Sequence, residues 1–263
     1  MKTVLFFINT LSNLHVGSGE INYGLVDNLI QRDPVTKLPT INSSSLKGAL
    51  REHFEKYSDK KIDVCRLFGS EPKAKPEDRM TGSLRFFDAD LVSISARTTG
   101  GVPFVSVSSK ENLSRIWRRL ETFGVKAQFL DNISNLPKTQ NNKEQTVRIE
   151  DLRSECLYAT VDKYKSIVGE RIAIVDDPDL NAICDNEHLP VISRNCLEDG
   201  ISSNLFYEQV LPRYSHLCTV VMGPEADLNV FCQALEGQVV QIGGNATIGY
   251  GYCQFTNFNP EKK

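Results

Sequence analysis

The sequence lacks the short-range patterns that mark most metal-binding and disulfide-bonded proteins. Its seven cysteines form no CxxC pair, and its four histidines show no HxH or HExxH spacing. Close pairs of cysteine or histidine are typical of zinc sites, and even sets of cysteines in short secreted chains indicate disulfides. We therefore expect neither, and interpret the cysteines as free, partly buried thiols of a protein that resides in the reducing cytoplasm.

Excess positive charge and long apolar runs are also missing. The formal net charge is −3, whereas small autonomous nucleic-acid-binding domains are usually basic. This charge argues against free, sequence-independent nucleic-acid binding, but it does not exclude a basic groove on one face of the protein. No apolar run reaches the ~20 residues of a membrane-spanning helix, so we expect no membrane span. The 263 residues, 40% hydrophobic, are enough for one large domain with a sizeable core.

Helix and strand patterns alternate along the chain. Apolar spacing predicts helices at 43–57, 109–124 and 227–237. Strands are predicted at 3–11, 101–108, 154–161, 215–223, 238–242 and 251–255, with one or two more in 82–94. Residues 130–148 are polar and predict a mobile insertion, and the acidic residues 173–190 predict irregular structure. The alternation indicates an α+β fold of the ferredoxin-like kind.

Two segments have features of phosphate binding. In "INSSSLKGALRE", serines precede a helix, whose free N–H groups favour an anion, and Lys47 adds positive charge. Taken alone, this segment is better interpreted as an ordinary helix cap with a surface lysine. In "QIGGNATIGYGYCQF", four glycines at 243, 244, 249 and 251 could let a backbone approach phosphates closely, or could serve a wide hairpin loop that needs positive φ.

Three further features have a structural and a functional interpretation. Residues 190–214 have the pattern of a hairpin with "EDG" as its turn, and Phe206 and Tyr207 would either join the core or stack against bases. The arginines of "SRIWRRL" indicate a solvated helix face. His15 and Asp27, in the glycine-containing loop after the first strand, could form an acid/base pair, although a lone loop aspartate usually forms a turn.

Taken together and in order, these segments resemble the RAMP superfamily of CRISPR proteins, and within it the repeated backbone subunit of type III-B (Cmr) effector complexes. The resemblance covers Leu14 to Phe255. The stretches that carry it are "LHVGSG", "GLVDNLIQRDPVTKLPTINSSSLKGALR", "LFGS", "GSLRFFDADL", "LFYEQVLP" and "QIGGNATIGYGYCQF". The fourth and fifth of these resemble the Cmr version more than its type III-A counterpart.

The resemblance implies a single domain over residues 1–263, with an RRM-like palm, a helical insertion and a protruding thumb hairpin at about 188–212. The polar insertion at about 130–150 matches no part of the family. The implied partners are CRISPR guide RNA, target RNA, further copies of the chain in a filament, and other Cmr subunits. Each copy would grip guide phosphates, each thumb would displace a base pair, and target RNA would be cut at regular intervals.

The resemblance also assigns residues. Asp27 would be the catalytic aspartate of an endoribonuclease and a possible ligand of a divalent cation, Mg²⁺ or Mn²⁺, that the isolated chain would not hold stably. His15 and Glu208 would lie nearby. The implied guide RNA contacts are Ser44, Ser45, Lys47, Arg51, Gly243, Gly244, Asn245, Gly249 and Gly251, and the implied thumb residues are Arg194, Asn195, Phe206 and Tyr207.

Three alternatives remain open at this point. The chain could be a non-catalytic RNA-binding scaffold of the same complex, the type III-A counterpart, or an unrelated enzyme that binds a small phosphorylated molecule.

Overall fold

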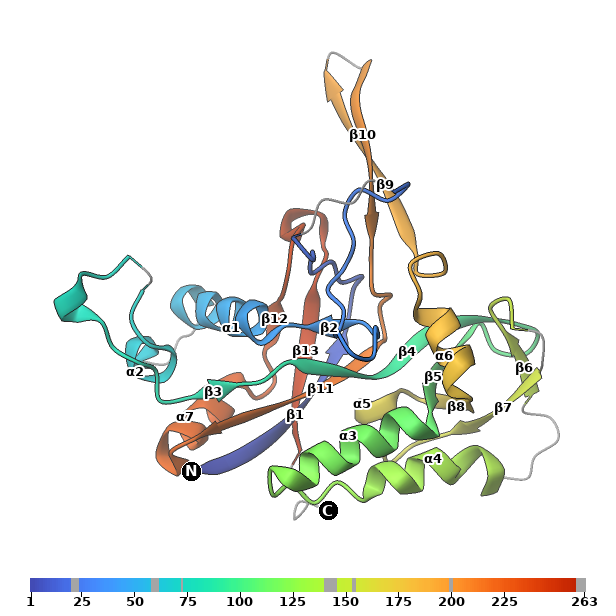
Figure 1. The fold of residues 1–263 in the computed structure, drawn as a ribbon, viewed down its shortest axis with the longest axis horizontal. Coiled ribbons are helices and arrows are strands. Elements are labelled where there is room, and N and C mark those ends of the chain that lie inside the picture. Colours follow the sequence, from blue (N-terminus) through green and yellow to red (C-terminus); the bar gives the residue numbers. More distant parts are fainter. Residues whose placement is uncertain are drawn as a thin grey trace.

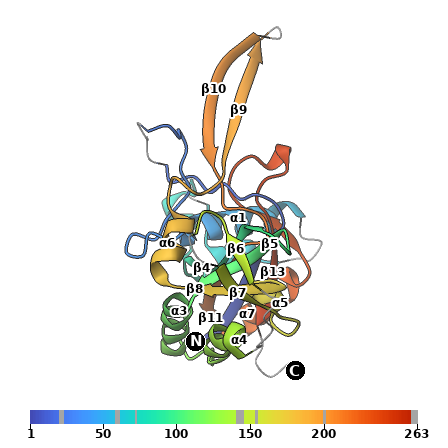
Figure 2. The ribbon, with the colours of Figure 1, turned by 90° about the vertical axis from the view of Figure 1, so that its right-hand side faces the viewer.

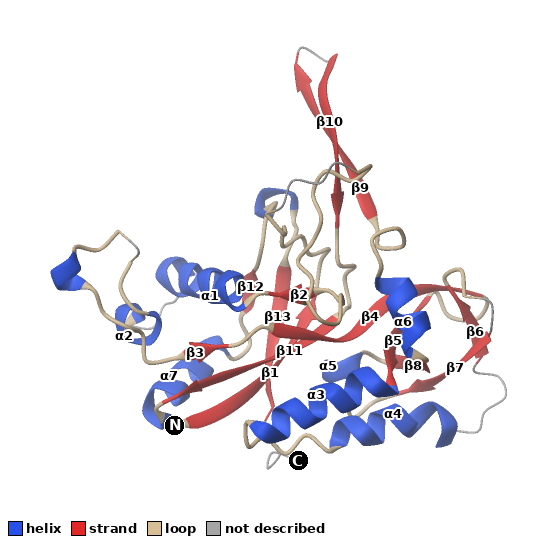
Figure 3. Ribbon diagram, viewed as in Figure 1, coloured by secondary structure: helices blue, strands red, loops and turns tan. Residues whose placement is uncertain are grey.

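The computed structural model describes residues 1–19, 24–57, 62–71, 73–139, 146–152, 155–198 and 201–258. These residues form a mixed α/β fold, with one large curled sheet, several helices packed on it, and a two-stranded hairpin that projects away from the rest (Figure 1, Figure 2). Figure 3 separates the strands from the helices and loops around them.

The elements follow the chain in a largely alternating order. The strands are β1 (Lys2–Thr10), β2 (Thr40–Ile41), β3 (Arg85–Phe86), β4 (Ala89–Thr99), β5 (Phe104–Ser109), β6 (Thr146–Ile149), β7 (Glu155–Thr160), β8 (Arg171–Val175), β9 (Val191–Glu198), β10 (Ile201–Gln209), β11 (His216–Gly223), β12 (Val239–Gln241) and β13 (Tyr252–Phe258). The helices are α1 (Ser43–Tyr57), α2 (Val64–Phe68), α3 (Lys110–Thr122), α4 (Phe129–Thr139), α5 (Lys165–Val168), α6 (Asp177–Cys184) and α7 (Glu225–Leu235), with 3₁₀ turns η1 (Pro76–Asp78) and η2 (Ala246–Ile248).

The large sheet has the strand order β12-β13-β1-β11-β4-β5-β8-β7-β6. Every neighbouring pair on this path is antiparallel except β5 and β8. Its last strand, β6, also pairs with β4, so strands β4, β5, β8, β7 and β6 close into a ring. The short strands β2 and β3 attach to β4 and β11.

Strand β1 lies inside the sheet and separates two cores. Its side chains alternate between the two faces of the sheet, as the period of a strand requires. Phe6 and Ile8 are buried in the core that contains α1 and α7, while Leu5 and Phe7 are buried in the core that contains α3, α4 and α5. The unbroken apolar run at the start of the sequence is therefore explained by burial on both faces.

The two amphipathic helices predicted before residue 130 are confirmed. α1 spans 43–57 as predicted, and its Leu46 and Leu50 are buried. α3 begins after Ser109, whose Oγ accepts a hydrogen bond from the Asn112 amide as an N-cap should. Gly124, at φ 77°, follows the end of α3 in the left-handed conformation expected of a helix stop.

Two segments predicted to lack regular structure contain helices, so those predictions are wrong. In 130–148, residues up to Thr139 belong to α4, with Leu130 and Ile133 buried, and β6 follows; residues 140–145 lie outside the described part. In 173–190, the end of β8 is followed by α6. Acidic residues in the first turn favour α6, and apolar contacts on one side bury it, so local composition was a poor guide.

The predicted hairpin is formed by β9 and β10, which make a sheet separate from the large one. Part of its turn, residues 199–200, lies outside the described residues. Leu205 is 53% exposed, and Phe206 and Tyr207 are only half-buried, so the interpretation of these two aromatic residues as core residues is wrong. The hairpin therefore owes its position to contacts at its base rather than to a core of its own.

The six cysteines whose side chains are described form no disulfide bond, and of these only Cys65 is exposed. No helix formed by the described residues combines the length and the apolar character needed to cross a bilayer.

Candidate functional site

The loop after β1, here called the opening loop (residues 11–19 and 24–39), is hydrogen-bonded to the base of the hairpin. The amides of Asp27 and Asn28 both donate to the carbonyl oxygen of Tyr207 at 3.1 Å, and the Gln209 amide donates to the Asn28 carbonyl oxygen at 2.9 Å. Asn28 thus pairs with Glu208 of β10 in a parallel bridge. Segments far apart in sequence are thereby fixed side by side.

The Asp27 side chain is exposed and oriented by the hairpin. Its Oδ2 accepts a hydrogen bond from the Tyr207 amide at 2.8 Å, across 180 positions of sequence. The described contacts do not support the alternative interpretation, in which the Asp27 carboxylate accepts hydrogen bonds from the backbone of its own turn. One oxygen of an exposed carboxylate is held in place at the root of a projecting hairpin.

His15 is buried and lies between the hairpin and the glycine loop (residues 242–251). Its Nδ1 is 2.7 Å from the carbonyl oxygen of Gln209, and a carbonyl oxygen only accepts, so Nδ1 carries the proton. The Gly244 amide donates to the His15 carbonyl oxygen at 2.9 Å. No hydrogen bond joins His15 to Asp27 among the described residues, so the structure does not bring them together as an acid/base pair.

Glu208 is the centre of a polar network that joins three segments. Its Oε2 is 3.0 Å from a guanidinium nitrogen of Arg194 on β9 and accepts a hydrogen bond from Asn245 Nδ2 at 2.8 Å. Its Oε1 is 3.5 Å from Asn28 Nδ2. Arg194 also donates to Asn245 Oδ1 and lies over the Phe206 ring, 5.3 Å from its centroid. Because Glu208 is only 6% exposed, it is a structural anchor between hairpin, opening loop and glycine loop.

These carboxylates do not form a coordination site for a divalent cation. Both Glu208 oxygens already accept hydrogen bonds or pair with Arg194, and one Asp27 oxygen accepts from a backbone amide. Within the described ranges, no group of three or more His, Cys, Asp or Glu side chains is placed to share a metal ion. Mg²⁺ needs near-octahedral oxygen ligands, which the described residues do not supply.

Two of the hydrogen-bonding groups at the start of α1 already have partners within the chain. The Ser43 amide donates to Asp88 Oδ1 at 2.6 Å, and Ser45 Oγ accepts from Gln31 Nε2 at 3.0 Å. Lys47 is half-buried and Ser44 is exposed. Within the described ranges, the side chains of Ser44 and Lys47 make no hydrogen bond or ion pair. Of the guide contacts predicted on α1, Ser44 and Lys47 therefore remain available to a ligand.

Arg51 has several partners within the chain. Its Nε lies 2.7 Å from Glu55, and its NH1 donates to the carbonyl oxygens of Gly69 and Ser70 at 2.9 and 3.2 Å. The side chain is 16% exposed. Arg51 therefore connects α1 to the segment after α2, and its contact with guide RNA stays a prediction.

Three of the four glycines in the glycine loop are required by its backbone. Gly243, Gly249 and Gly251 have φ values of 81°, 84° and 77°. A Cβ on Gly243 would lie 2.2 Å from the His15 carbonyl oxygen, whereas a Cβ on Gly244 would meet nothing closer than 3.9 Å. Gly244 is exposed and outside the positive-φ set, so loop geometry does not explain it.

We expect Gly243→Ala to lower the free energy of unfolding by more than about 1 kcal/mol, because the methyl group collides with backbone at a positive φ. Gly244→Ala, its neighbour, should stay within about 0.5 kcal/mol of wild type. Urea denaturation of the two variants measures this difference. Equal stabilities would show that Gly243 does not approach the His15 carbonyl so closely.

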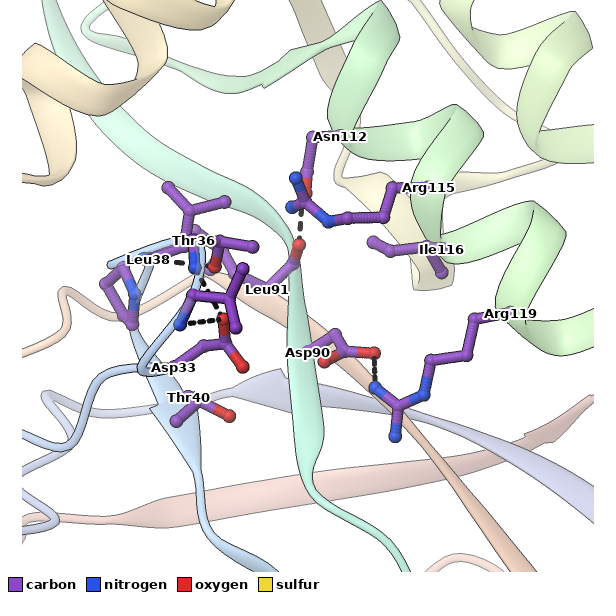
Figure 4. Close-up of a pocket in the computed structure, with 12 residues that line it drawn as sticks. Asp33, Thr36, Leu38, Thr40, Asp90, Leu91, Asn112, Arg115, Ile116 and Arg119 are labelled. Atoms are coloured by element: carbon purple, nitrogen blue, oxygen red, sulfur yellow. Dashed lines mark hydrogen bonds and ion pairs between the residues drawn. The ribbon is translucent and has the colours of Figure 1, made fainter.

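The solvated face predicted for the arginines of α3 is confirmed for Arg115 and Arg118, which are exposed, whereas Arg119 is half-buried. Arg119 forms an ion pair with Asp90, and Arg115 donates to Asn112 Oδ1, beside a cleft between α3, β4 and the 33–40 segment (Figure 4). Burial raises the pKa of the Asp90 carboxyl despite the neighbouring Arg119. Only Arg118 of the three lies outside this cleft.

Two glutamines that sequence reasoning missed hold the site together. Gln209, fully buried, accepts from the Ile30 amide through Oε1. Gln31 donates to the Gly17 carbonyl oxygen and accepts from the Asn42 amide, and so joins the opening loop to the start of α1. Isolated glutamines in apolar stretches carry no local pattern that would predict this.

The sequence from residue 7 to 254 matches the RAMP superfamily, so the chain belongs to this superfamily. A relative from Pyrococcus furiosus, CRISPR system Cmr endoribonuclease Cmr4, is 29% identical in an alignment of 289 positions, which covers 97% of this chain and 96% of that protein. CRISPR system Cms endoribonuclease Csm3 from Methanothermobacter thermautotrophicus is 41% identical, but over 71 residues, 22% of this chain and 29% of that protein.

Solved structures share the fold. A chain of the type III-B Cmr-beta complex bound to cognate target RNA has a TM-score of 0.77 at 19% identity, covering 98% of this chain and 97% of that one. Oligomeric Cmr4 from Pyrococcus furiosus has a TM-score of 0.70 at 24% identity, covering 98% and 99%. At these identities the likeness concerns the fold alone.

Proposed function

We propose that this chain is the repeated backbone subunit of a type III-B CRISPR effector complex, which binds guide RNA along a filament of copies and cleaves complementary target RNA at regular intervals. The observation that carries the catalytic part is the exposed Asp27 carboxylate, fixed by the Tyr207 amide at the root of the hairpin. The superfamily, and a Cmr endoribonuclease similar over nearly the whole chain, support the assignment. Such a complex would act in the cytoplasm.

The fold supports a palm and a thumb. Strands β13, β1, β11 and β4 are neighbours in that order and antiparallel. In the chain, α1 lies between β1 and β4, and α7 lies between β11 and β13. In the sheet, β11 lies between β1 and β4, and β1 lies between β13 and β11. This is the split βαβ arrangement of ferredoxin-like palms. The projecting β9–β10 hairpin would be the thumb (Figure 1).

The proposed chemistry relies on a nucleophile that RNA provides. A target nucleotide whose base is displaced by the hairpin can turn its 2′-OH in line with the neighbouring phosphate, which a regular duplex prevents. Asp27, beside the hairpin base, would accept the 2′-OH proton while the 2′-oxygen bonds to phosphorus and the P–O5′ bond breaks; the products would be a 2′,3′-cyclic phosphate and a 5′-oxygen that takes a proton from water. Arg194 and Phe206 stack on one another on the hairpin, so the pair forms a stiff flank for the displaced base. His15 and Glu208 would act by positioning the loops rather than by touching RNA.

A divalent cation would take its ligands mainly from RNA phosphates and water, because the described carboxylates build no site for one. The guide RNA would be bound by the glycine loop and by Lys47 and Ser44 near the start of α1. The acidic net charge of −3 fits a subunit that shares the guide with many copies and with other Cmr subunits.

The same fold also fits a scaffold in which Asp27 is not catalytic, and the type III-A counterpart. Similarity over 97% of this chain to a Cmr protein, against 22% to 42% for Csm3 proteins, favours type III-B. Purifying the native complex from its source tests all three. We expect CRISPR-derived guide RNA, Cmr partner subunits and regularly spaced cuts in a complementary RNA. Csm partner subunits would assign type III-A, and a complex without RNA would overturn the proposal.

A further inference from the structure

A cavity of about 530 Å³, lined by both polar and aromatic residues, lies apart from the proposed RNA-cleavage site. It is bounded by α5 and the turn after it, by β1 and β13, and by the segment before β11; α5 packs against β1 and lies beside β13 in Figure 2. None of its lining residues belongs to the opening loop, the hairpin or the glycine loop. Pockets for small ligands commonly measure ~300–1,000 Å³, so the size suits a nucleotide.

One wall of the cavity is an aromatic pair in an unusual backbone setting. Tyr214 and Phe104 stack with ring centroids 5.4 Å apart and planes 9° apart, and both line the cavity. Tyr214 has φ 67°, a conformation that bulky residues rarely adopt. It is held there because its amide donates to the Thr10 carbonyl oxygen at 2.6 Å and the next amide, of Ser215, donates to Thr10 Oγ1 at 3.0 Å. Such backbone strain persists where surroundings over-determine it, and it clusters at ligand sites.

A second wall offers a hydrogen-bond acceptor. Asn9 Oδ1 is buried and has no hydrogen-bond partner among the described residues. Gln254, which faces Asn9 across the β1–β13 pair, lines the same cavity. A buried polar atom of this kind calls for an explanation, and a ligand N–H group would satisfy it.

The mouth of the cavity is cationic. Lys165 and Arg171 line it together with one carboxylate, Glu170, whose distance of 3.9 Å from Arg171 is too long for a hydrogen bond. His216 adds no positive charge at neutral pH, because burial lowers its pKa to about 4. Two cations against one carboxylate favour an anionic group.

We propose that this cavity binds a nucleotide, with its base against the Phe104–Tyr214 pair, an N–H group of the base donating to Asn9 Oδ1, and its phosphate held by Lys165 and Arg171. The aromatic wall and the buried acceptor together match a base, and the cationic mouth matches a phosphate. None of these three features alone would indicate a nucleotide. The nucleotide is either free or part of an RNA strand.

The test is a titration of the full chain with N-methylanthraniloyl-AMP, followed by fluorescence. We expect saturable binding that unlabelled AMP displaces. Lys165→Glu and Asn9→Leu should each weaken binding at least ~10-fold, as expected when one hydrogen bond or ion pair is removed. The matched control is Lys163→Glu, because Lys163 lies on the same segment, over the Tyr164 ring, and does not line the cavity. Its affinity should equal that of wild type.

Asn9→Leu should not lower the melting temperature, because it replaces an unpartnered buried acceptor by an apolar group of similar size. A lowered melting temperature would place the acceptor in a structural role and overturn its part in binding, while Lys165→Glu, at an exposed position, still decides the phosphate contact. Competition by an eight-nucleotide single-stranded RNA as well as by AMP would identify RNA as the source, and competition by AMP alone a free nucleotide. Displacement by inorganic phosphate as effectively as by AMP, equal affinities in all variants, or no saturable binding would overturn the proposal.

Discussion

Complexes in which every copy carries Asp27→Asn are expected to bind complementary RNA as wild type does and to cleave it at least ~100-fold more slowly. The Asn side chain keeps an oxygen that can accept the Tyr207 amide hydrogen, so the loop should stay fixed to the hairpin. What it loses is the negative charge that accepts a proton or attracts a cation. Cleavage of a labelled complementary RNA, beside a filter-binding measurement, separates the two effects.

Three controls sharpen this result. Asp33→Asn changes another aspartate of the opening loop, whose Oδ1 accepts from the Val35 and Thr36 amides, and cleavage should stay near wild type. Asp27→Ala also removes the bond to the Tyr207 amide; if Asn keeps activity and Ala loses it, Asp27 positions the hairpin and is not catalytic. Adding EDTA to the wild-type complex should stop cleavage if a divalent cation takes part. Full cleavage by the Asn variant would leave the chain as a scaffold.

Lys47→Glu combined with Gly244→Asp should weaken guide RNA association at least ~10-fold at physiological salt, whatever the guide sequence. Lys47 is only half-buried, and Gly244 is exposed with room for a Cβ, so the fold should persist in the variant. The slope of log affinity against log salt concentration should fall by about one unit for each phosphate that the variant no longer binds. RNA content of the purified complex and binding at several salt concentrations measure both quantities.

A charge-matched control is available on α1 and on β13, the strand that follows the glycine loop. Lys56→Glu, at the far end of α1 where Lys56 pairs with Glu52, combined with Asn257→Asp on β13, changes the net charge equally. This variant should retain guide RNA. Equally weakened association in both variants would mean that overall charge, rather than the α1 start and the glycine loop, determines guide binding.

The elements that the sequence predicted correctly are those whose signals are local. α1 and α3 each carry one apolar face within a single window, α3 also has its Ser109 cap, and β1 is a compact apolar run. α4 was missed although Phe129, Leu130, Ile133 and Leu136 recur at helical spacing, because the polar residues between them were given more weight than that pattern. α6 is buried by contacts with β5 and α3, which its acidic sequence does not indicate.

The candidate site divides in the same way. Asp27 and the glycine loop were identified by resemblance, and residue patterns alone left both undecided. The contacts of Glu208 with Asn245 and of Arg194 with Asn245 span 37 and 51 positions, and no pattern in one segment could predict them. The sequence also suggested more glycines than a hairpin needs, whereas the backbone accounts for all but Gly244.

The ring formed by β4, β5, β8, β7 and β6 has a consequence for a protein present in many copies. A ring of strands has no terminal strand, so within the described residues the large sheet ends at β12, of three residues, at residues 255–258 of β13, which β12 does not cover, and at the two-residue strands β2 and β3. Long exposed strand edges invite pairing between molecules. Copies of this chain therefore have little opportunity to join their large sheets edge to edge, which protects against uncontrolled β-aggregation and leaves side-chain surfaces to determine how the copies stack.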